Sequence, residues 1–296
     1  MRVLHLSDTH LGHEAWFRGA PKGWRRADDH LAAMRRVLAP ALAEEVDVVV
    51  HTGDLFNRSR PPAKAIAAAA AVLADVARVV PTVVMAGNHD RRGVRGHFPD
   101  PPPGLTVVDA PCTLAVAGLR FGVVPFLREP AAWRAAAAVV CAAGVDALLT
   151  HQAFDGSRVP GFTFRPSPGS DTLGEADLPA GVRVILNGHI HTRQNLRLGG
   201  AVVHHVGSTE RTSFVERDEP KAASVWEPGA GVRTIDAAPR PMVVVRGAVD
   251  LPLVTPECLV ALGRAAQTEE LEAEAQARGG WVAAWARPTR QVGLFG

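Results

Sequence analysis

The stretch from Val46 to Pro62, VDVVVHTGDLFNRSRPP, joins an apolar run to a carboxylate. The run ends in Gly53-Asp54, and a further polar residue, Asn57, follows three positions later. A short run of valines with a glycine after it is typical of a buried strand. In α/β folds the carboxyl ends of such strands meet in one crevice, where functional sites form. We therefore expect Asp54 to belong to a site at a strand end.

The same pattern of an apolar strand followed by polar residues occurs at four other places in the chain. The strands and their polar followers are VLHLS with Asp8-Thr9-His10, TVVMA with Gly87-Asn88-His89-Asp90, ALLT with His151, and VILN with Gly188-His189-Ile190-His191. Apolar residues at helical spacing over 27–45, and an Ala-rich helix from Pro61 to about Arg78, separate the first three strands. This β-α-β-α-β order implies parallel strands with both faces covered, so the five segments are expected to converge.

Two aspartates, one asparagine and four histidines in these segments form a ligand set for two divalent metals. Carboxylate and imidazole together suit manganese, iron or zinc better than calcium. In His-x-His, extended backbone points alternate residues to the same side. The glycines before Asp54, Asn88 and His189 permit tight backbone as the chain leaves each strand. One Asp-x-His alone means little, but five such segments in this order predict a metal centre.

The full pattern of Asp-x-His, Gly-Asp, Gly-Asn-His-Asp, His and Gly-His-x-His over residues 8–191 resembles the calcineurin-like metallophosphoesterase superfamily. The resemblance implies an α/β fold, a four-layer α-β-β-α sandwich of two mixed sheets. The metal ligands that it implies are Asp8, His10 and His191 for one ion, and Asn88, His151 and His189 for the other. Asp54 would bridge the two ions, with one oxygen to each. Two such ions, most simply Mn(II) with Fe, Zn or Mg as alternatives, can polarise a phosphate for in-line attack.

His89 has a separate role in this family pattern. The resemblance implies that it lies beside the phosphate, where it stabilises developing charge or protonates the leaving oxygen. Across much of the superfamily an acid or a histidine occupies the position of Asn57 and orients this histidine. An amide oxygen can accept the ring N–H but brings no charge. We therefore expect Asn57 to orient His89, and Asn57→Asp to shift the pH–rate profile.

Further segments narrow the resemblance to the SbcD-type DNA repair nucleases. These segments, within about residues 1–250, are LHLSDTHLG, GDLFNRSRPP, HQAFDG, DLP at 177–179, GSTERTSF at 207–214 and RPMVVV at 240–245. The implied activity is manganese-dependent exonuclease and endonuclease cleavage of DNA, by a homodimer. The arginines expected at backbone phosphates are Arg58, Arg60, Arg91 and Arg92. Trp16 and Trp24, in a basic loop, either stack on a frayed DNA end or pack on the protein's own surface.

The last fifth of the sequence departs from that pattern. We expect a nuclease domain over 1–240 and then a small β-α-β cap over 241–286, with its helix from Thr255 to about Arg278. Relatives carry a fuller cap and helices that bind an SbcC-type ATPase, so binding of that partner is in doubt here. In the tail, 287–296, the residues Gln291, Leu294 and Phe295 resemble the Gln-x-x-Leu-Phe peptide that docks on the DNA sliding clamp. The alternatives are that this tail folds back or that the match is accidental.

Composition limits the other possibilities. Apolar residues make up 47% of the 296 residues, and the net charge is only +2, so a packed core is available and any basic surface is local. Three widely spaced cysteines show no zinc or disulfide spacing, which fits the cytoplasm. No apolar run reaches the roughly 18 residues of a membrane span, and the start leaves no room for a leader. The alternative function is hydrolysis of a small phosphodiester or phosphomonoester; a binding module with a purely structural metal fits the complete ligand set less well.

Overall fold

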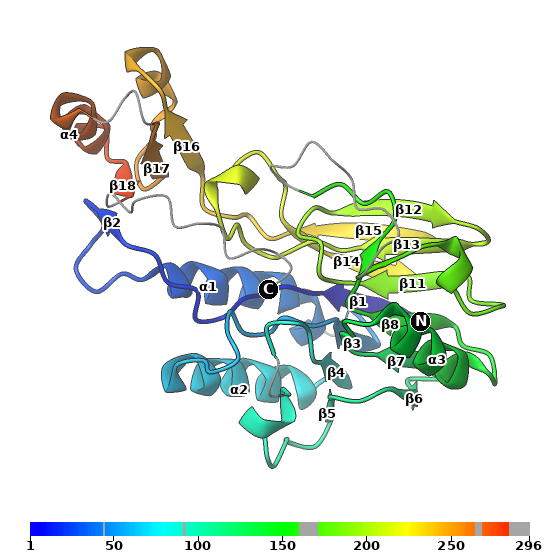
Figure 1. Cartoon of the computed structure of the whole chain (residues 1–296). Helices are drawn as coiled ribbons and strands as arrows, with labels where there is room; N and C mark the ends of the chain where they lie inside the picture. The colour runs from blue at the N-terminus through cyan, green and yellow to red at the C-terminus, as the bar shows by residue number, and fades with distance from the viewer. Residues whose placement is uncertain (44, 91–92, 160–170, 264–267, 284–296) are drawn as a thin grey trace.

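The computed structural model describes residues 1–43, 45–90, 93–159, 171–263 and 268–283. Two six-stranded sheets are stacked against each other, and helices cover their outer faces (Figure 1). This is the four-layer α-β-β-α arrangement expected from the sequence. A smaller lobe near the C-terminal end of the described chain projects from one side.

The first sheet has the strand order β15-β14-β1-β3-β4-β5. Its strands are β1 (Val3–Leu6), β3 (Val48–His51), β4 (Thr82–Met85), β5 (Leu105–Val108), β14 (Ala222–Glu227) and β15 (Gly231–Asp236). The four strands β1, β3, β4 and β5 are parallel, and β14 and β15 extend the sheet in antiparallel fashion beside β1. The carboxyl ends of β1, β3 and β4 therefore lie at one edge.

The second sheet has the order β12-β13-β11-β8-β7-β6. Its strands are β6 (Cys112–Val116), β7 (Leu119–Val124), β8 (Ala147–Thr150), β11 (Val184–Asn187), β12 (Gln194–Leu198) and β13 (Ala201–His205). The inner strands β7, β8, β11 and β13 are parallel, whereas β6 and β12 are antiparallel edge strands. The sequence had not led us to expect β12 or β15, in which polar residues alternate with apolar ones along exposed edges.

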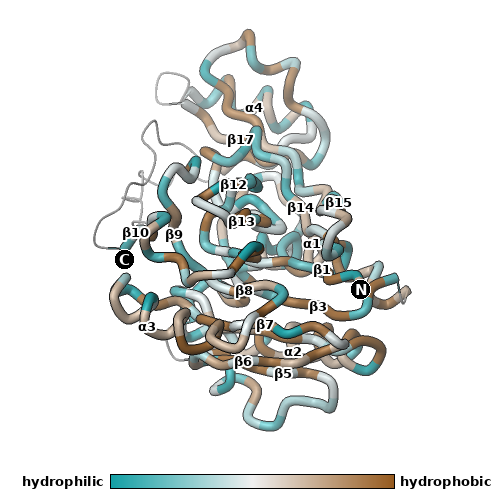
Figure 2. The backbone as a smooth tube through the Cα atoms, turned by 90° about the vertical axis from the view of Figure 1, so that its right-hand side faces the viewer, coloured by the Kyte–Doolittle hydropathy of each residue, from teal (hydrophilic) through white to brown (hydrophobic). Residues whose placement is uncertain are grey.

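Alternation along the strands builds the core. In β1, Leu4 faces the layer of α1 (Arg26–Leu42) and α2 (Ala63–Ala77), while Val3 faces the second sheet. The second sheet packs its outer face on α3 (Pro130–Cys141), through residues that include the fully buried Trp133. Figure 2 shows the apolar residues gathered along these strands and helices. Because both faces of each sheet are covered, its central strands read as continuous apolar runs in the sequence.

The lobe is a four-stranded sheet with one helix. It contains β16 (Met242–Val245), η4 (Ala248–Leu253), β17 (Leu259–Leu262), α4 (Glu269–Ala277), β18 (Trp281–Ala283) and, from the start of the chain, β2 (Phe17–Arg18). The predicted helix from Thr255 to Arg278 is wrong. The apolar run at 259–262 is a strand that buries its side chains in the lobe core, and the helix begins only after Thr268, whose hydroxyl caps Leu271 N–H.

Short elements connect these layers. They are η1 (Arg95–His97), β9 (Ala153–Phe154), β10 (Thr172–Leu173), η2 (Glu175–Asp177) and η3 (Phe214–Glu216). The stretch 155–180 contains β10 and η2, and its residues 160–170 lie outside the described chain. The tail at 287–296 also lies outside it. No helix within the described ranges combines the length and the apolar character that crossing a membrane requires.

Candidate metal centre

The residues proposed as ligands follow the carboxyl ends of five parallel strands, three in the first sheet and two in the second. Asp8 and His10 follow β1, Asp54 follows β3, Asn88 follows β4, His151 follows β8, and His189 and His191 follow β11. Backbone hydrogen bonds hold the first two loops together, since Asp8 N–H donates to Gly53 O (3.0 Å) and His10 N–H donates to Asp54 O (3.1 Å). The structure therefore brings all seven predicted positions to one place.

The backbone at this place is strained. Asp8, His10, Asp54 and His189 all have positive φ angles, of 51°, 44°, 54° and 72°. Residues with a Cβ rarely adopt this left-handed conformation, which costs of order 1–3 kcal/mol each. Such strain persists where the surrounding structure fixes it, and it is concentrated at functional sites. Here it occurs in the loops after β1, β3 and β11.

The glycines in the motifs are required by close approach. A Cβ on Gly87 would lie 2.2 Å from Asp54 Oδ1, and a Cβ on Gly188 would lie 2.1 Å from Ser7 Oγ. At Gly53 a Cβ would lie 2.4 Å from His151 Nδ1, and its φ of +100° also excludes most other residues. Any side chain at these positions would push the ligand loops apart.

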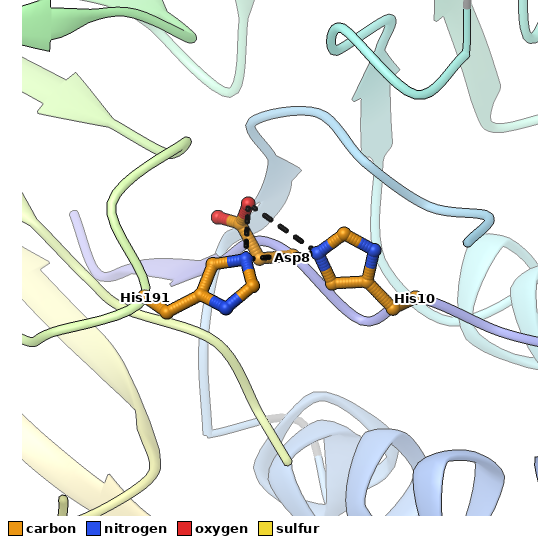
Figure 3. A group of neighbouring side chains, drawn as sticks. All are labelled: Asp8, His10 and His191. Carbon is orange, nitrogen blue, oxygen red and sulfur yellow. Dashed lines mark hydrogen bonds and ion pairs between the residues drawn. The ribbon is translucent and has the colours of Figure 1, made fainter. Parts of the chain in front are cut away.

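The first ligand group consists of Asp8, His10 and His191 (Figure 3). The Nε2 atoms of the two histidines lie 3.0 Å apart. Asp8 Oδ1 lies 3.9 Å from His10 Nε2 and 3.8 Å from His191 Nε2, and it is buried without a hydrogen-bond partner among the described residues. The other oxygen, Oδ2, accepts His189 N–H at 3.0 Å. His151 Nε2 of the second group also lies 4.0 Å from this oxygen. A carboxylate oxygen left without a donor but facing three imidazole nitrogens is suited to a cation.

The second group consists of Asn88, His151 and His189. Asn88 Oδ1 lies 3.0 Å from His151 Nε2 and 2.9 Å from His189 Nδ1. These three residues follow β4, β8 and β11, so both sheets contribute to the group. The amide oxygen and the two ring nitrogens are the donor types expected around a divalent transition metal.

Asp54 lies between the two groups. Its Oδ2 is 3.4 Å from His151 Nε2 and 3.9 Å from His10 Nε2. Its Oδ1 accepts the backbone N–H of His89 at 2.8 Å. Oδ2 thus lies near one histidine of each group, and the bridging of two ions by Asp54 stays a prediction.

Two of the histidines have their Nδ1 atoms fixed from behind. His151 Nδ1–H donates to Thr52 O (2.6 Å), and His191 Nδ1–H donates to Glu216 Oε1 (2.9 Å). When Nδ1 carries the proton, the lone pair of Nε2 is free to bind a metal. Both rings therefore present Nε2 to the centre.

Burial and neighbouring charge set the protonation of the centre. Burial raises the pKa of Asp8. Burial acts in the same direction on Asp54, but the neighbouring histidines, His151 first, outweigh it and hold the pKa of Asp54 well below its usual range. Burial lowers the pKa of His151, yet the charge of Asp54 outweighs it and raises that pKa to about 9. The carboxylates thus attract positive charge, which a divalent cation also supplies.

The predicted contact between Asn57 and His89 is wrong in one respect. His89 Nδ1–H donates to the backbone oxygen of Asn57 (2.8 Å), not to its side chain. The side-chain Oδ1 instead lies 3.3 Å from Nδ1 of His13. Because the main chain orients His89, any residue at position 57 can supply that contact.

Several residues that support the centre were not predicted from the sequence. The Asp90 carboxylate accepts N–H groups of Leu55, Phe56 and Gly87, with distances of 3.0–3.3 Å, and so joins the loops after β3 and β4. Phe126 places its ring 5.6 Å from that of His189. Asp90 is visible within the Gly-Asn-His-Asp motif, but nothing in the sequence marks Phe126.

The residues proposed for DNA contacts differ in exposure and in their neighbours. Arg58 and Arg60 are exposed and make no ion pair or side-chain hydrogen bond among the described residues. Trp16 is 73% exposed, with Arg25 over its ring at 6.0 Å. Of the two alternatives left open for Trp24, the structure shows packing on the protein itself, since its ring packs against Trp281 of the lobe with centroids 4.7 Å apart. The proposed residues outside the described chain are Arg91, Arg92, Gln291, Leu294 and Phe295.

Comparison with known sequences gives matches over most of the chain. The family model described as calcineurin-like phosphoesterase matches residues 1–193. The DNA double-strand break repair protein Mre11 of Halobacterium salinarum is 30% identical over 224 residues, which cover 73% of this chain and 54% of that protein. The SbcD component of the SbcCD nuclease of Rhodobacter capsulatus is 34% identical over 93 residues, 30% of this chain and 22% of that protein. The chain spans about half the length of the first curated relatives it matches, 54% and 55%.

Comparison with solved structures supports the fold. The crystal structure of the protein TT1561 of Thermus thermophilus matches with a TM-score of 0.50 at 12% sequence identity. The match covers 80% of this chain and 98% of that one. At this identity the likeness concerns the fold alone.

Proposed function

The chain belongs to the calcineurin-like phosphoesterase family, and on this premise we propose that it is a two-metal DNA nuclease in DNA repair or DNA-end processing. The observation that carries the proposal is the pair of adjacent candidate ligand groups on either side of Asp54, whose Oδ2 lies 3.9 Å from His10 Nε2 of one and 3.4 Å from His151 Nε2 of the other. The choice of DNA as substrate is supported by relatives named for DNA double-strand break repair. Cleavage is proposed to be both exonucleolytic and endonucleolytic.

The described side chains suit two divalent cations. Asp8, His10 and His191 would hold one, and Asn88, His151 and His189 the other, with Asp54 between them. Burial of Asp8 Oδ1 without a donor supports this assignment, since such an oxygen is costly unless a cation compensates it. Imidazole with carboxylate suits manganese, iron or zinc. The SbcD-type resemblance favours Mn(II), with Fe, Zn or Mg as alternatives. Bound ions would polarise the phosphate and lower the pKa of the attacking water.

His89 would act on the substrate itself. Its side chain is 38% exposed, and Nε2 lies 3.9 Å from Asp54 Oδ2, so the ring reaches from the centre toward solvent. Because Nδ1–H is held by Asn57 O, Nε2 is the atom available to the phosphate. In its protonated form, Nε2–H would donate to a phosphate oxygen or to the leaving oxygen.

Exposed arginines next to the centre would hold the DNA backbone. Arg58 and Arg60 follow Asp54 closely in the sequence, and no described acidic group neutralises them. Guanidinium groups bind phosphates without regard to sequence, so these residues would set affinity and its salt dependence. Trp16, exposed beside Arg25, would stack on an unpaired base.

Hydrolysis of two substrates tests the proposal. Wild-type protein with Mn²⁺ is expected to degrade labelled linear duplex and single-stranded DNA much faster than a chromogenic small diester. The Arg58→Gln/Arg60→Gln double variant should lose affinity for DNA and show a shallower salt dependence, while its rate on the small diester stays unchanged. Arg197→Gln, an exposed arginine on β12, is the matched control. Rapid hydrolysis of the small diester, together with no cleavage of DNA, would contradict the assignment of DNA as the substrate.

Partners and location complete the proposal. Residues 287–296, through Gln291, Leu294 and Phe295, would dock on the DNA sliding clamp; deleting 290–296 should abolish clamp capture in a pull-down and leave nuclease activity on naked DNA intact. Undiminished capture would contradict this role.

Homodimer formation and an SbcC-type ATPase partner are proposals that rest on the SbcD-type resemblance. The unpaired cysteines Cys112, Cys141 and Cys258 support a cytoplasmic location.

A further inference from the structure

Glu216 is a buried carboxylate directly behind the proposed metal ligand His191. Its Oε1 accepts Nδ1–H of His191 at 2.9 Å, and its side chain is only 5% exposed. It ends η3, twenty-five residues after His191 in the sequence and just beyond the GSTERTSF segment. A carboxylate in this position fixes the ring and increases the donor strength of Nε2.

Donors other than the His191 ring also hold Glu216 in place. Lys221 Nζ lies 2.6 Å from Glu216 Oε2, and the lysine side chain is fully buried. The same ammonium group donates to His191 O (3.1 Å) and Ser208 Oγ (2.8 Å). Thr212 Oγ1 donates to Glu216 Oε1 at 2.7 Å. The carboxylate is therefore held by Lys221 and Thr212 and points at His191.

Two other histidines of the centre are supported differently. His151, in the second group, rests its Nδ1–H on a backbone carbonyl, that of Thr52. His10 Nδ1 is buried without a hydrogen-bond partner among the described residues. Within the part of the chain that the structure describes, a carboxylate acceptor for a ligand imidazole is thus seen at His191. The support from Glu216 reaches one of the two ions.

We propose that Glu216 is a positioning residue that selectively strengthens binding of the ion held by Asp8, His10 and His191. The inference rests on the proposed function, because it assumes the metal centre. It predicts that removing the Glu216 charge weakens one ion and spares the ion at Asn88, His151 and His189. A merely structural role would weaken both ions together.

Equilibrium dialysis against Mn²⁺, with bound metal counted by mass spectrometry, tests this inference without any nuclease assay. Wild type should bind two ions, and Glu216→Gln should bind one tightly and the other about 10- to 100-fold more weakly. Glu210→Gln is the matched control, since Glu210 is as buried in the same segment but pairs with Arg26. It should bind two ions as the wild type does.

Three results would overturn the inference or its premise. Glu216→Gln that binds both ions like the wild type shows that the carboxylate does not act on the metal. Weakening of both ions to the same degree assigns Glu216 a structural role. Wild-type protein that binds no Mn²⁺ removes the metal centre itself, a failure of the proposed function that the wild-type arm reveals alone.

A second variant guards against misfolding. In Glu216→Gln the buried Lys221 loses its counter-charge, which can unfold the protein. The charge-balanced variant Glu216→Gln/Lys221→Met removes both charges at similar side-chain volume. Its unfolding transition, measured in the presence of chelator, should be cooperative. With Mn²⁺ it should show the same selective loss of one ion. Two tightly bound ions in this variant would overturn the inference.

Discussion

The histidine at position 89 and the asparagine at position 57 show how the main chain can take over a side-chain role. A family pattern with an acid at position 57 suggests a charged partner for the catalytic histidine. Here the carbonyl of Asn57 accepts the His89 ring N–H instead. The amide side chain is turned toward His13, with Oδ1 3.3 Å from His13 Nδ1, and so is not the acceptor of the His89 ring N–H.

A pair of alanine variants tests this interpretation. His89→Ala should slow DNA cleavage by about 100- to 10,000-fold, because it removes the group proposed to act on the phosphate. Asn57→Ala keeps the backbone carbonyl and should reduce the rate much less, by under about tenfold. Rates are compared with saturating DNA and Mn²⁺. Equal losses in the two variants would show that the Asn57 side chain does orient His89.

Single residues of the site could be predicted from the sequence where a polar side chain follows an apolar strand. Asp8, Asp54 and His151 could be found because each stands directly after an apolar run. Glu216 could not, because its contact with His191 depends on how the chain returns twenty-five residues later. The hydrogen bond from His89 N–H to Asp54 Oδ1 was not predictable either, since it depends on how the loop after β4 folds back on β3.

The end of β11 joins two ligand loops through Asn187. Its Oδ1 accepts Gln152 N–H (3.0 Å), and its Nδ2 donates to Gln152 O (2.8 Å) and Gly188 O (2.7 Å). Gln152 follows the ligand His151, and Gly188 precedes the ligand His189. The buried amide thus fixes the distance between the loops after β8 and β11.

Replacing this amide should affect stability and the second ion together. Asn187→Ala leaves buried backbone groups without partners, at a cost of about 1–3 kcal/mol each, and frees both loops. We expect a lower unfolding midpoint in denaturant and weaker binding of the ion at Asn88, His151 and His189. Asn195→Ala, on the exposed edge strand β12, should change neither property. Wild-type stability in Asn187→Ala would refute the bridging role.

Elements were predictable where burial on both faces made them uniformly apolar. The central strands β1, β3 and β4 carry that pattern, and all three were found from it. The prediction of one helix in the lobe was wrong because Leu259–Leu262 and α4 lie close together in the sequence and resemble one continuous helix. Tertiary packing in the small lobe core decided between strand and helix there.

At the scale of the whole molecule, the contacts of Arg240 form the joint between the main body and the lobe. Arg240 forms two contacts of 2.8 Å with Asp29 of α1 and lies over the Trp281 ring of β18 at 4.3 Å. Trp24 lies on the same guanidinium group at 5.5 Å. Strand β2 adds the start of the chain to the lobe sheet. The GSTERTSF segment also reaches this joint, since Glu210 accepts Arg240 N–H.

Loss of this arginine should loosen the lobe without emptying the metal centre. Arg240→Gln is expected to lower the free energy of unfolding by about 2–4 kcal/mol, from charged hydrogen bonds and the cation–π contact. Denaturant unfolding measures this change, and Mn²⁺ dialysis should still find two bound ions. Arg246→Gln, exposed within the lobe, is the control. An unchanged unfolding midpoint would show that Arg240 does not hold the joint.

The proposed protein is a metal-dependent nuclease in which Asp54 joins two ions. The most direct measurement is the Mn²⁺-dependent cleavage rate of end-labelled duplex DNA by wild-type protein and by Asp54→Ala purified in parallel. We predict cleavage by the wild type that chelator abolishes, and a rate lower by about 100-fold or more in Asp54→Ala. Cleavage that survives the chelator, equal rates for the two proteins, or inert wild type with Mn²⁺ would contradict the account.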